Sequence, residues 1–236
     1  MVLLGMPNKH LDLSAPESGR RRLSHAQEDY VKAIFHLEGA KTQVGTSQLA
    51  ERLAVSAASA TEMLGKLAAM GLVSHDRYRG ASLTAAGEAV ALEIIRHHRL
   101  LEMYLAQKLG YAWDEVHEEA ELLEHVISER MEHRIFEVLG HPEVDCHGDP
   151  IPSLQGRLPE APQRSLAAAL AGERLHVLRV SDRDAGKLRA LHELGIRLGV
   201  EIEVLSESVY EGPVAVRVAG RRRQLPLGIA REVFVG

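Results

Sequence analysis

The sequence is poor in cysteine, because Cys146 is the one thiol among 236 residues. An intramolecular disulfide is therefore excluded, and so is a zinc site built from several thiolates. A lone thiol could still act as a ligand or a nucleophile, but an inert, partly buried side chain is the favoured interpretation.

Long hydrophobic runs are also missing. No apolar stretch approaches the roughly 18 residues that a membrane span requires, and the apolar start at residues 1–6 has neither a basic region nor a cleavage signal. With 45% hydrophobic and 26% charged residues, the chain has enough apolar side chains for one large or two small domains. A cytoplasmic protein without a membrane partner is expected.

The sequence also lacks an excess of basic residues, since its formal net charge is -5. The total points to no particular partner, but its distribution is informative. Residues 91–140 contain eleven Asp or Glu residues, five Lys or Arg residues, and five of the thirteen histidines. Acidic and imidazole side chains are therefore concentrated in one part of the chain.

The densest part of this region predicts a cation site. On a helix, four side chains at positions i, i+4, i+7 and i+8 share one face: His117, Glu121, Glu124 and His125. His98 and Glu102 form a second pair, at i and i+4, on the preceding predicted helix. Carboxylates combined with imidazoles bind divalent Mn, Fe, Co or Zn. A solvated acidic stripe is the alternative interpretation.

Residues 25–90 have the layout of a winged helix-turn-helix domain. Helical periodicity at 26–37 precedes a short helix at 47–53 and a helix of small residues at 56–67, which Ser56 caps. Small side chains allow such a helix to lie close to base edges in the major groove. Two short strands within 74–84 would flank a tip formed by Arg77, Tyr78 and Arg79.

Before this domain, residues 1–24 mix Pro, Ser and Gly with three consecutive arginines, which predicts a disordered arm. The arm either touches DNA or is a passive tail. Within residues 25–90, six Lys or Arg residues face seven Asp or Glu residues. Contacts between Lys or Arg side chains and DNA phosphates supply most non-specific affinity for DNA. Basic charge alone would therefore not hold this domain on DNA. A bound divalent ion together with dimer symmetry would provide it.

The rest of the chain divides into three parts. Residues 91–140 are predicted to be helices whose apolar faces suit a dimer as well as an internal core. Residues 141–173 contain five prolines and predict a linker. Residues 174–236 alternate as strands around one helix at 184–194, which predicts a small SH3-like β-barrel. The predicted fold class is mainly α with a small β domain.

Four strings of residues resemble the diphtheria toxin repressor family of metal-dependent transcriptional repressors. They are residues 28–30, 96–102, 116–125 and 147–152, which read EDY, RHHRLLE, VHEEAELLEH and HGDPIP. The resemblance covers residues 25–236 and corresponds to the three-domain form. It implies a DNA-binding repressor that is activated by a metal ion.

The resemblance also assigns metal ligands. Its primary regulatory site corresponds to Asp29, Glu121, Glu124 and His125. Its ancillary site corresponds to His98, Glu102 and His117, with Asp182 as a further contribution from the last domain. Iron-sensing members carry Met and Cys where this chain has carboxylates, and hard oxygen ligands favour Mn(II). Manganese is therefore the expected cofactor, and Fe(II) is the second choice.

Two departures from the family pattern stand out. The small two-domain manganese sensors have Glu at the position of Lys32, so their paired two-metal arrangement is not expected here. The longer members contribute Glu and Gln to the ancillary metal from the last domain, where this chain has Arg179 and Asp182. Because arginine cannot ligate a metal, only Asp182 is expected to contribute.

DNA contacts are expected from the second helix of the motif and from the wing. Glu62 could accept from a cytosine amino group and Ala58 could touch a thymine methyl, while the others would contact phosphate. The full set is Ser56, Ala58, Ser59, Thr61, Glu62, Lys66, Arg77 and Arg79. Solvated surface is the alternative interpretation for any of them.

The function predicted from these features is a homodimeric, Mn(II)-dependent repressor that controls metal-uptake genes from a palindromic operator. The same protein could instead respond to Fe(II). From a different class, the His and Glu helices could form a di-metal carboxylate enzyme, although this leaves the winged helix unexplained. A third possibility keeps the DNA-binding domain but replaces the metal by a small organic effector.

Overall fold

The computed structural model of the chain describes residues 23–38, 43–76, 79–182, 184–207 and 212–236. The predicted arm up to residue 22 lies outside the described residues. Leu23 and Ser24 belong to the folded part, since Leu23 packs against the first core and the carbonyl of Ser24 accepts from the backbone N–H of Gln27 at 2.8 Å.

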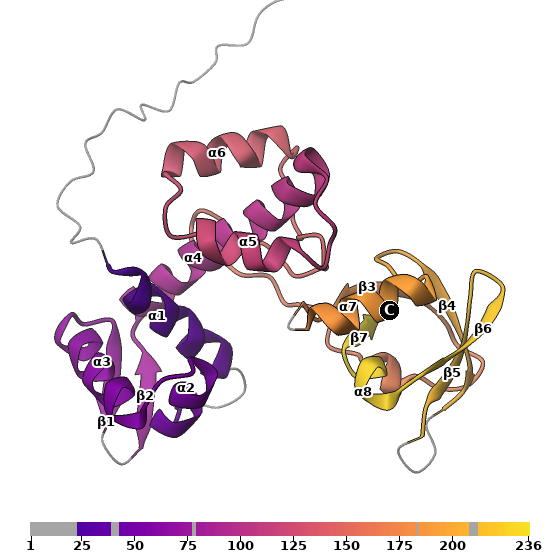
Figure 1. The fold of residues 1–236 in the computed structure, drawn as a ribbon, viewed down its shortest axis with the longest axis horizontal. Helices are drawn as coiled ribbons and strands as arrows, with labels where there is room; N and C mark the ends of the chain where they lie inside the picture. Colours follow the sequence, from indigo (N-terminus) through magenta and orange to yellow (C-terminus); the bar gives the residue numbers. More distant parts are fainter. Residues whose placement is uncertain (1–22, 39–42, 77–78, 183, 208–211) are drawn as a thin grey trace, which may run out of the picture.

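The first body is a winged helix-turn-helix (Figure 1). Its elements are α1 (His25–Glu38), α2 (Thr46–Arg52), α3 (Ala57–Ala69), β1 (Val73–Asp76) and β2 (Gly80–Leu83), with the two strands paired antiparallel. Ser56 caps α3 by accepting from the backbone N–H of Ser59 at 3.0 Å, as predicted. Gly80 has φ 107°, and a Cβ there would lie 2.4 Å from the carbonyl oxygen of Val44. Only glycine allows this close approach.

The second body is helical. It contains α4 (Ala85–Tyr104), a short π-helix η1 (Leu105–Leu109), α5 (Val116–Leu123) and α6 (Glu129–Val138). The helical spacing predicted for residues 117–125 was wrong at its end, because α5 stops at Leu123 and His125 lies in the following turn. Ser128 then caps α6 by accepting from the backbone N–H of Met131.

The third body is a five-stranded antiparallel sheet with the order β6-β5-β4-β3-β7. Its elements are η2 (Leu166–Ala168), β3 (Arg174–Val180), α7 (Ala185–Leu194), β4 (Glu201–Ser206), β5 (Val214–Val218), β6 (Arg221–Leu225), α8 (Leu227–Ala230) and β7 (Val233–Val235). The predicted SH3-like β domain is an open sheet and not a closed barrel: within the described residues, β6 and β7 are its opposite edges. The SH3-like strand content and the helix at 184–194 were confirmed, with Asp184 as the cap of α7.

The proline-rich segment 141–173 packs against both neighbours instead of only joining them. Ile151 is buried in the core of the helical body, and Leu166 is buried in the core of the sheet body. Gly148 has φ 88°, and a Cβ there would lie 2.2 Å from the carbonyl oxygen of Leu178 in β3. The segment therefore runs directly against the sheet and fixes how the two bodies meet.

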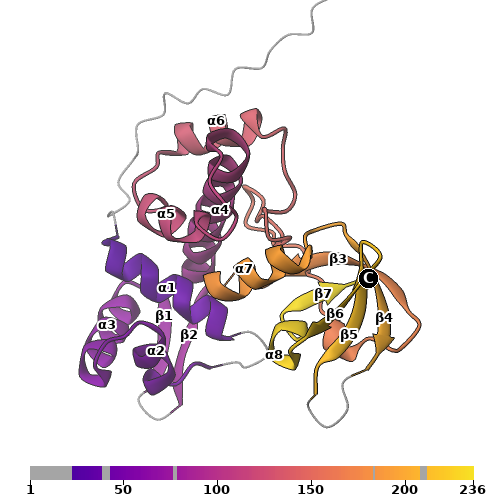
Figure 2. The same cartoon turned by 45° about the vertical axis from the view of Figure 1, so that its right-hand side comes forward.

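The three bodies surround one central region. Figures 1 and 2 show α4 running from the winged helix into the helical body, and α7 pointing from the sheet body toward α1. None of the helices that the structure describes is long and apolar enough to span a membrane.

Candidate metal centre

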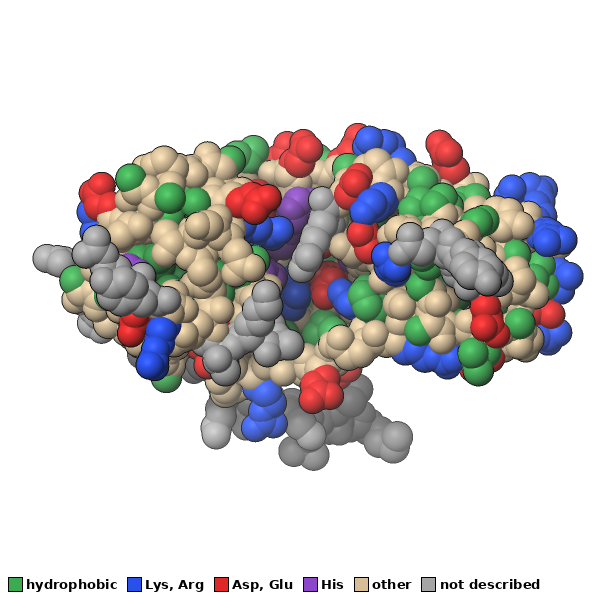
Figure 3. Space-filling view, turned by 90° about the horizontal axis from the view of Figure 1, so that it is seen from below, with side chains coloured by type: hydrophobic (Ala, Val, Ile, Leu, Met, Phe, Trp, Pro, Cys, Tyr) green, Lys and Arg blue, Asp and Glu red, His purple; other side chains and the backbone are tan. Residues whose placement is uncertain are grey.

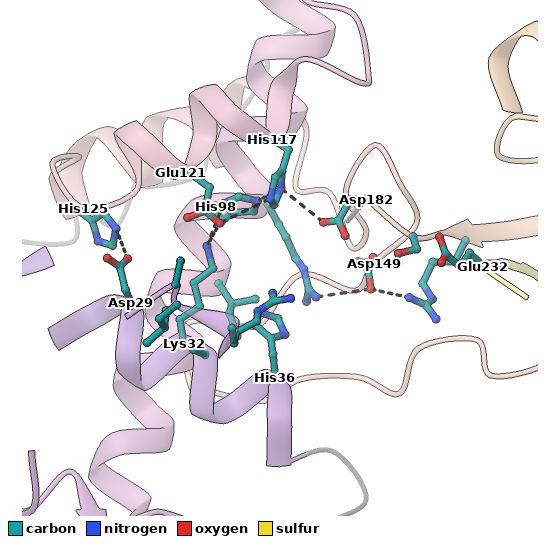
Figure 4. Close-up of a pocket in the computed structure, with 18 of the residues that line it drawn as sticks. Asp29, Lys32, His36, His98, His117, Glu121, His125, Asp149, Asp182 and Glu232 are labelled. Carbon is teal, nitrogen blue, oxygen red and sulfur yellow. Dashed lines mark hydrogen bonds and ion pairs between the residues drawn. The ribbon is translucent and has the colours of Figure 1, made fainter. Parts of the chain in front are cut away.

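A cleft of about 770 Å³ lies where the three bodies meet. Its walls come from α1 and α2 of the winged helix, from α4 and α5, and from β3 with the loop that follows it. In the space-filling view, histidine, acidic and basic side chains gather in this hollow (Figure 3). The close-up in Figure 4 shows that they point toward one another from different elements.

Three of the four predicted primary ligands meet at the contact between α1 and the turn after α5. One ligand atom from each of Asp29, Glu124 and His125 lies within 4.8 Å of the others. The Nε2 of His125 is 3.0 Å from Asp29 Oδ1, and its Nδ1 is 2.6 Å from Glu28 Oε2. Hydrogen bonds to Asp29 and Glu28 raise the pKa of His125 to about 10. Protonated His125 thus holds the first helix against the helical body.

Glu121, the fourth predicted primary ligand, contacts a lysine instead. Nζ of Lys32 donates to Glu121 Oε1 at 2.7 Å (Figure 4). It also donates to the two carboxylate oxygens of Glu124 at 2.7 and 2.9 Å. His98 Nδ1 lies 3.4 Å from the same nitrogen. Burial opposes ionisation of Glu121, but Lys32 outweighs it and lowers the pKa of this carboxyl. The lysine therefore connects α1, α4 and α5.

The predicted ancillary ligands converge beside this lysine. His98 Nε2 is 3.0 Å from Glu102 Oε1 and 3.1 Å from His117 Nδ1. Asp182 reaches the group from the loop after β3, with Oδ2 3.8 Å from His117 Nδ1. One ligand atom from each of these four residues lies within 4.8 Å of the others.

The ancillary group is buried and strongly coupled. Glu102 has no exposed surface and His98 is 5% exposed. Burial opposes protonation of His98, but Glu102 and Glu124 outweigh it and raise its pKa to about 9. Burial also opposes ionisation of Glu102, yet the neighbouring histidines hold its pKa well below the usual range. The group is therefore a charged network inside the helical body.

Arg179 does not enter this group. Its Nη1 lies 3.3 Å from Asp149 Oδ1, and its guanidinium stacks 3.6 Å above the ring of Phe234. Of the two positions contributed by the last domain, only Asp182 approaches the histidines, in agreement with the sequence prediction.

Two further residues, Cys146 and His147, adjoin the ancillary group, and neither was predicted from the sequence to be one of its ligands. Glu102, Cys146 and His147 have ligand atoms within 4.8 Å of one another. His147 Nδ1 is 3.6 Å from Glu102 Oε2, too long for a hydrogen bond, so this buried oxygen has no partner. Burial raises the pKa of Asp145 to about 7, assisted by Glu102 and Asp149. In the sequence, the HGDPIP string at residues 147–152 could have indicated that His147 lies near the ancillary group.

The donor chemistry of the cleft fits a divalent metal ion. Carboxylate oxygens and imidazole nitrogens converge there, and the unpartnered Oε2 of Glu102 lies 3.6 Å from His147 Nδ1. A buried carboxylate oxygen without a donor is costly unless a cation or water satisfies it. The same residue types suit Mn, Fe, Co or Zn.

The predicted DNA contacts lie together on the outer face of α3. Six of them are exposed: Ser56, Ala58, Ser59, Thr61, Glu62 and Lys66. Lys66 and Glu62 form an ion pair at 2.7 Å, and Thr61 donates to the carbonyl of Ala57. Arg79 is also exposed, in the turn just before β2, whereas Arg77 lies outside the described residues.

Comparison with known proteins agrees with this arrangement. The profile "Iron dependent repressor, N-terminal DNA binding domain" matches residues 22–81, "Iron dependent repressor, metal binding and dimerisation domain" matches 84–153, and "FeoA domain" matches 164–236. The diphtheria toxin repressor of Corynebacterium efficiens is 31% identical over 219 residues, which cover 88% of this chain and 94% of that protein. The chain belongs to the diphtheria toxin repressor family.

Other members of the family differ in the metal that their names give. The iron-dependent repressor IdeR of Mycobacterium leprae is 36% identical over 127 residues, covering 54% of this chain and 55% of that protein. A solved manganese-dependent transcriptional repressor in complex with manganese is 41% identical, with a TM-score of 0.81, and covers 89% of this chain and 98% of that one. A structure of ScaR with bound Cd2+ is 32% identical, with a TM-score of 0.77 and the same coverage.

This diphtheria toxin repressor family protein is therefore a metal-dependent transcriptional repressor with a DNA-binding domain and a metal-binding and dimerisation domain. Members of the family are transcriptional repressors and not enzymes, so the di-metal enzyme predicted as an alternative is excluded.

Proposed function

We propose that this chain is a Mn(II)-activated repressor that binds a palindromic operator as a homodimer and controls metal-uptake genes. The observation that carries the proposal is the donor set between α1 and α5, where Asp29, Glu124 and His125 offer two carboxylates and an imidazole without sulfur. Thiolate and thioether ligands favour softer ions, whereas oxygen-rich sites suit Mn(II). The high similarity to a manganese-dependent repressor supports the same choice.

The ion in the primary site would be held by Asp29, Glu121, Glu124 and His125. Asp29 comes from α1 of the DNA-binding body, and the other three come from α5 and the turn after it. When bound, the metal supplies positive charge that draws these carboxylates together. His98, Glu102, His117 and Asp182 would form the ancillary site, where buried Glu102 orients both histidines.

The link between α1 and α5 provides a mechanism for regulation. Ligands on two bodies allow an ion to favour one arrangement of the winged helix relative to the dimer core. An effector acts only through different affinities for two arrangements, so Mn(II) and operator DNA must strengthen each other's binding.

Exposed apolar side chains on the helical body support a dimer. Leu122 is 71% exposed, Val126 62% and Val138 55%, and all three lie on α5, the following turn or α6. Apolar residues exposed in one region indicate an interaction surface. A second copy of the chain would cover them and set the spacing of two winged helices for a palindrome.

We further propose the division into domains that the sequence predicts. Residues 25–90 would bind DNA, 91–140 would dimerise and hold the metal, and 174–236 would form the SH3-like domain, joined by residues 141–173. The exposed face of α3 would read bases through Ala58 and Glu62.

Fluorescence anisotropy on DNA from upstream of a manganese-transporter gene tests the proposal. The purified chain is titrated with Mn(II), then with Fe(II) under anaerobic conditions, and finally with a chelator. We expect binding to appear at a lower concentration of Mn(II) than of Fe(II) and to vanish with the chelator. Activation by Fe(II) at the lower concentration would instead assign the chain to the iron-responsive members. Binding that ignores both ions would remove the metal switch.

A further inference from the structure

A separate group of possible metal ligands lies where α4 meets the start of α6. One ligand atom from each of Glu93, His97 and Glu129 lies within 4.8 Å of the others. Glu93 and His97 are one turn apart on α4, and Glu129 is the first residue of α6. The group shares no residue with the primary or the ancillary group, and none of its members was predicted as a ligand.

The imidazole of His97 is held in the orientation that a metal ligand needs. Its side chain is 9% exposed, and its Nδ1 lies 3.3 Å from the backbone carbonyl oxygen of Glu124. Because a carbonyl oxygen only accepts, Nδ1 carries the proton and Nε2 of the neutral ring presents a lone pair. Histidine ligands commonly donate their second ring N–H to a backbone carbonyl in this way. The contact fixes the tautomer and the direction of Nε2.

Nε2 of His97 has no hydrogen-bond partner among the described residues. It lies 3.7 Å from Glu129 Oε1, which is too long for a hydrogen bond. Two ligands of a tetrahedral zinc ion, each about 2.1 Å from the metal, lie roughly 3.4 Å apart. The separation of the two atoms is therefore closer to that of two ligands of one ion than to that of a donor and its acceptor.

A neighbouring ion pair fixes the spacing of the two helices. Arg96 Nε donates to Glu132 Oε1 at 2.7 Å, and both side chains are buried. Arg96 directly precedes His97 on α4. Glu132 lies one turn after Glu129 on α6. The ion pair therefore keeps the two ligand positions close together, and ligands positioned in advance cost less entropy to order when an ion binds.

We propose that Glu93, His97 and Glu129 form a third cation site that binds a divalent ion of the zinc class, with water as the fourth ligand. Three protein ligands with water in the fourth position are typical of open zinc sites, and zinc generally binds such ligands more tightly than manganese does. Both carboxylates are exposed, which gives the ion a path from solvent. This site does not depend on the proposed Mn(II) function.

An ion at the third site would fix both ends of the turn between α5 and α6. The turn begins at Glu124, whose carbonyl accepts from His97. It ends at Ser128, which precedes Glu129. The turn also carries His125, a proposed ligand of the primary site. Zinc at the third site would therefore hold this turn against α4 and stabilise the folded chain.

Substitution of single ligands tests the site. Glu129→Gln removes one carboxylate, and the 63% exposed side chain of Glu129 makes this variant compatible with the fold. His97→Gln removes the imidazole. His176→Gln is the control, because His176 is an exposed histidine of β3. Asp29→Asn weakens the proposed primary site and leaves the third group intact.

Zinc bound per chain is measured by equilibrium dialysis, and the position of each ion by anomalous diffraction at the zinc edge from crystals grown with Zn(II). We expect Glu129→Gln and His97→Gln to bind one zinc ion fewer per chain than the wild type, whereas His176→Gln should match it. Asp29→Asn should keep the anomalous peak beside His97. Zn(II) should raise the Tm of the wild type by more than that of Glu129→Gln.

Two results would overturn the proposal. In one, Glu129→Gln and His97→Gln bind as many zinc ions as the wild type. In the other, anomalous peaks lie in the primary or ancillary group but none lies beside His97, which would make the third group a hydrated surface cluster. The proposed function fails separately, if wild-type operator binding ignores Mn(II). An ion beside His97 in a chain that ignores Mn(II) would remove only that function.

Discussion

The ancillary and primary groups of histidines and carboxylates differ in how deeply they are buried and in which elements contribute them. Three of the four residues of the ancillary group lie in the helical body, where Glu102 has no exposed surface and His98 is contacted by Glu124, Glu102 and His117. The primary group forms only where α1 meets the turn after α5, and Asp29 has a 41% exposed side chain. The first group is a buried network and the second is a contact between bodies. We therefore expect regulation at the primary group, because a ligand bound there can change how α1 and the helical body are arranged.

The largest effect is expected from Glu124→Gln, because Glu124 is the buried carboxylate of the group that it forms with Asp29 and His125. The primary site would lose this carboxylate, and apparent Mn(II) affinity should fall at least about 100-fold, since even substitutions outside the ligand sphere cost 10–100-fold. Operator binding should then no longer respond to Mn(II) in anisotropy titrations. Glu118→Gln, an exposed change on α5, is the control. A normal response in Glu124→Gln would contradict the proposed primary site.

Glu102→Ala tests whether the ancillary group is mainly structural. The imidazoles of His98 and His117 would lose their shared acceptor, and loss of one partner in a buried ion pair costs about 3–5 kcal/mol. We expect a loss of this order in the free energy of unfolding of the metal-free chain, measured in urea, while Mn(II) still promotes operator binding. A loss below about 1 kcal/mol, typical of exposed pairs, would mean that the network is not structural.

The pH dependence of Mn(II) binding tests whether His125 loses a proton when the metal binds to the primary site. In the metal-free chain the pKa of His125 is raised to about 10, so its imidazole is protonated near neutral pH. An imidazole must lose its extra proton before it can bind a metal, and each proton displaced makes affinity rise about tenfold per pH unit. Mn(II) titrations between about pH 6 and about pH 8 should therefore give tighter binding at higher pH. Affinity independent of pH would exclude His125 as a ligand.

The smallest effect is expected from Asp182→Asn. This residue is the contribution of the sheet body to the ancillary group, but its Oδ2 is 3.8 Å from His117 Nδ1 and the site is otherwise complete. We expect at most about a tenfold change in the affinity of the ancillary ion and unchanged binding of the primary one. Mn(II) dialysis with the wild type in parallel measures both. A loss of the primary ion would show that the two groups are one site.

The winged helix was predictable because its signals are local. Small residues on α3, the Ser56 cap and the turn before the wing each act within a few residues of sequence. The ancillary pair His98 and Glu102 was predictable for the same reason, because one turn of α4 brings them together.

The primary group was only partly predictable. Family resemblance indicated Asp29, Glu124 and His125, but helical spacing failed at the end of α5, where the turn redirects His125 toward α1. No local sequence pattern predicted that Lys32 would contact Glu121 and Glu124, which are 89 and 92 residues away. The openness of the sheet was not predictable either, because alternation predicts strands but not whether the edges of a sheet meet.

By itself the sequence determined the class of the protein: a small-residue helix with a wing, helices with histidine and carboxylate at helical spacing, and a domain of alternating strands. Those features depend on short-range periodicity and capping, which neighbouring residues settle. Only the tertiary structure decided which ligands meet, that Asp182 reaches His117, and that the Lys32 ammonium lies between Glu121 and Glu124. These contacts join residues far apart in the chain, so packing of the three bodies brings them together.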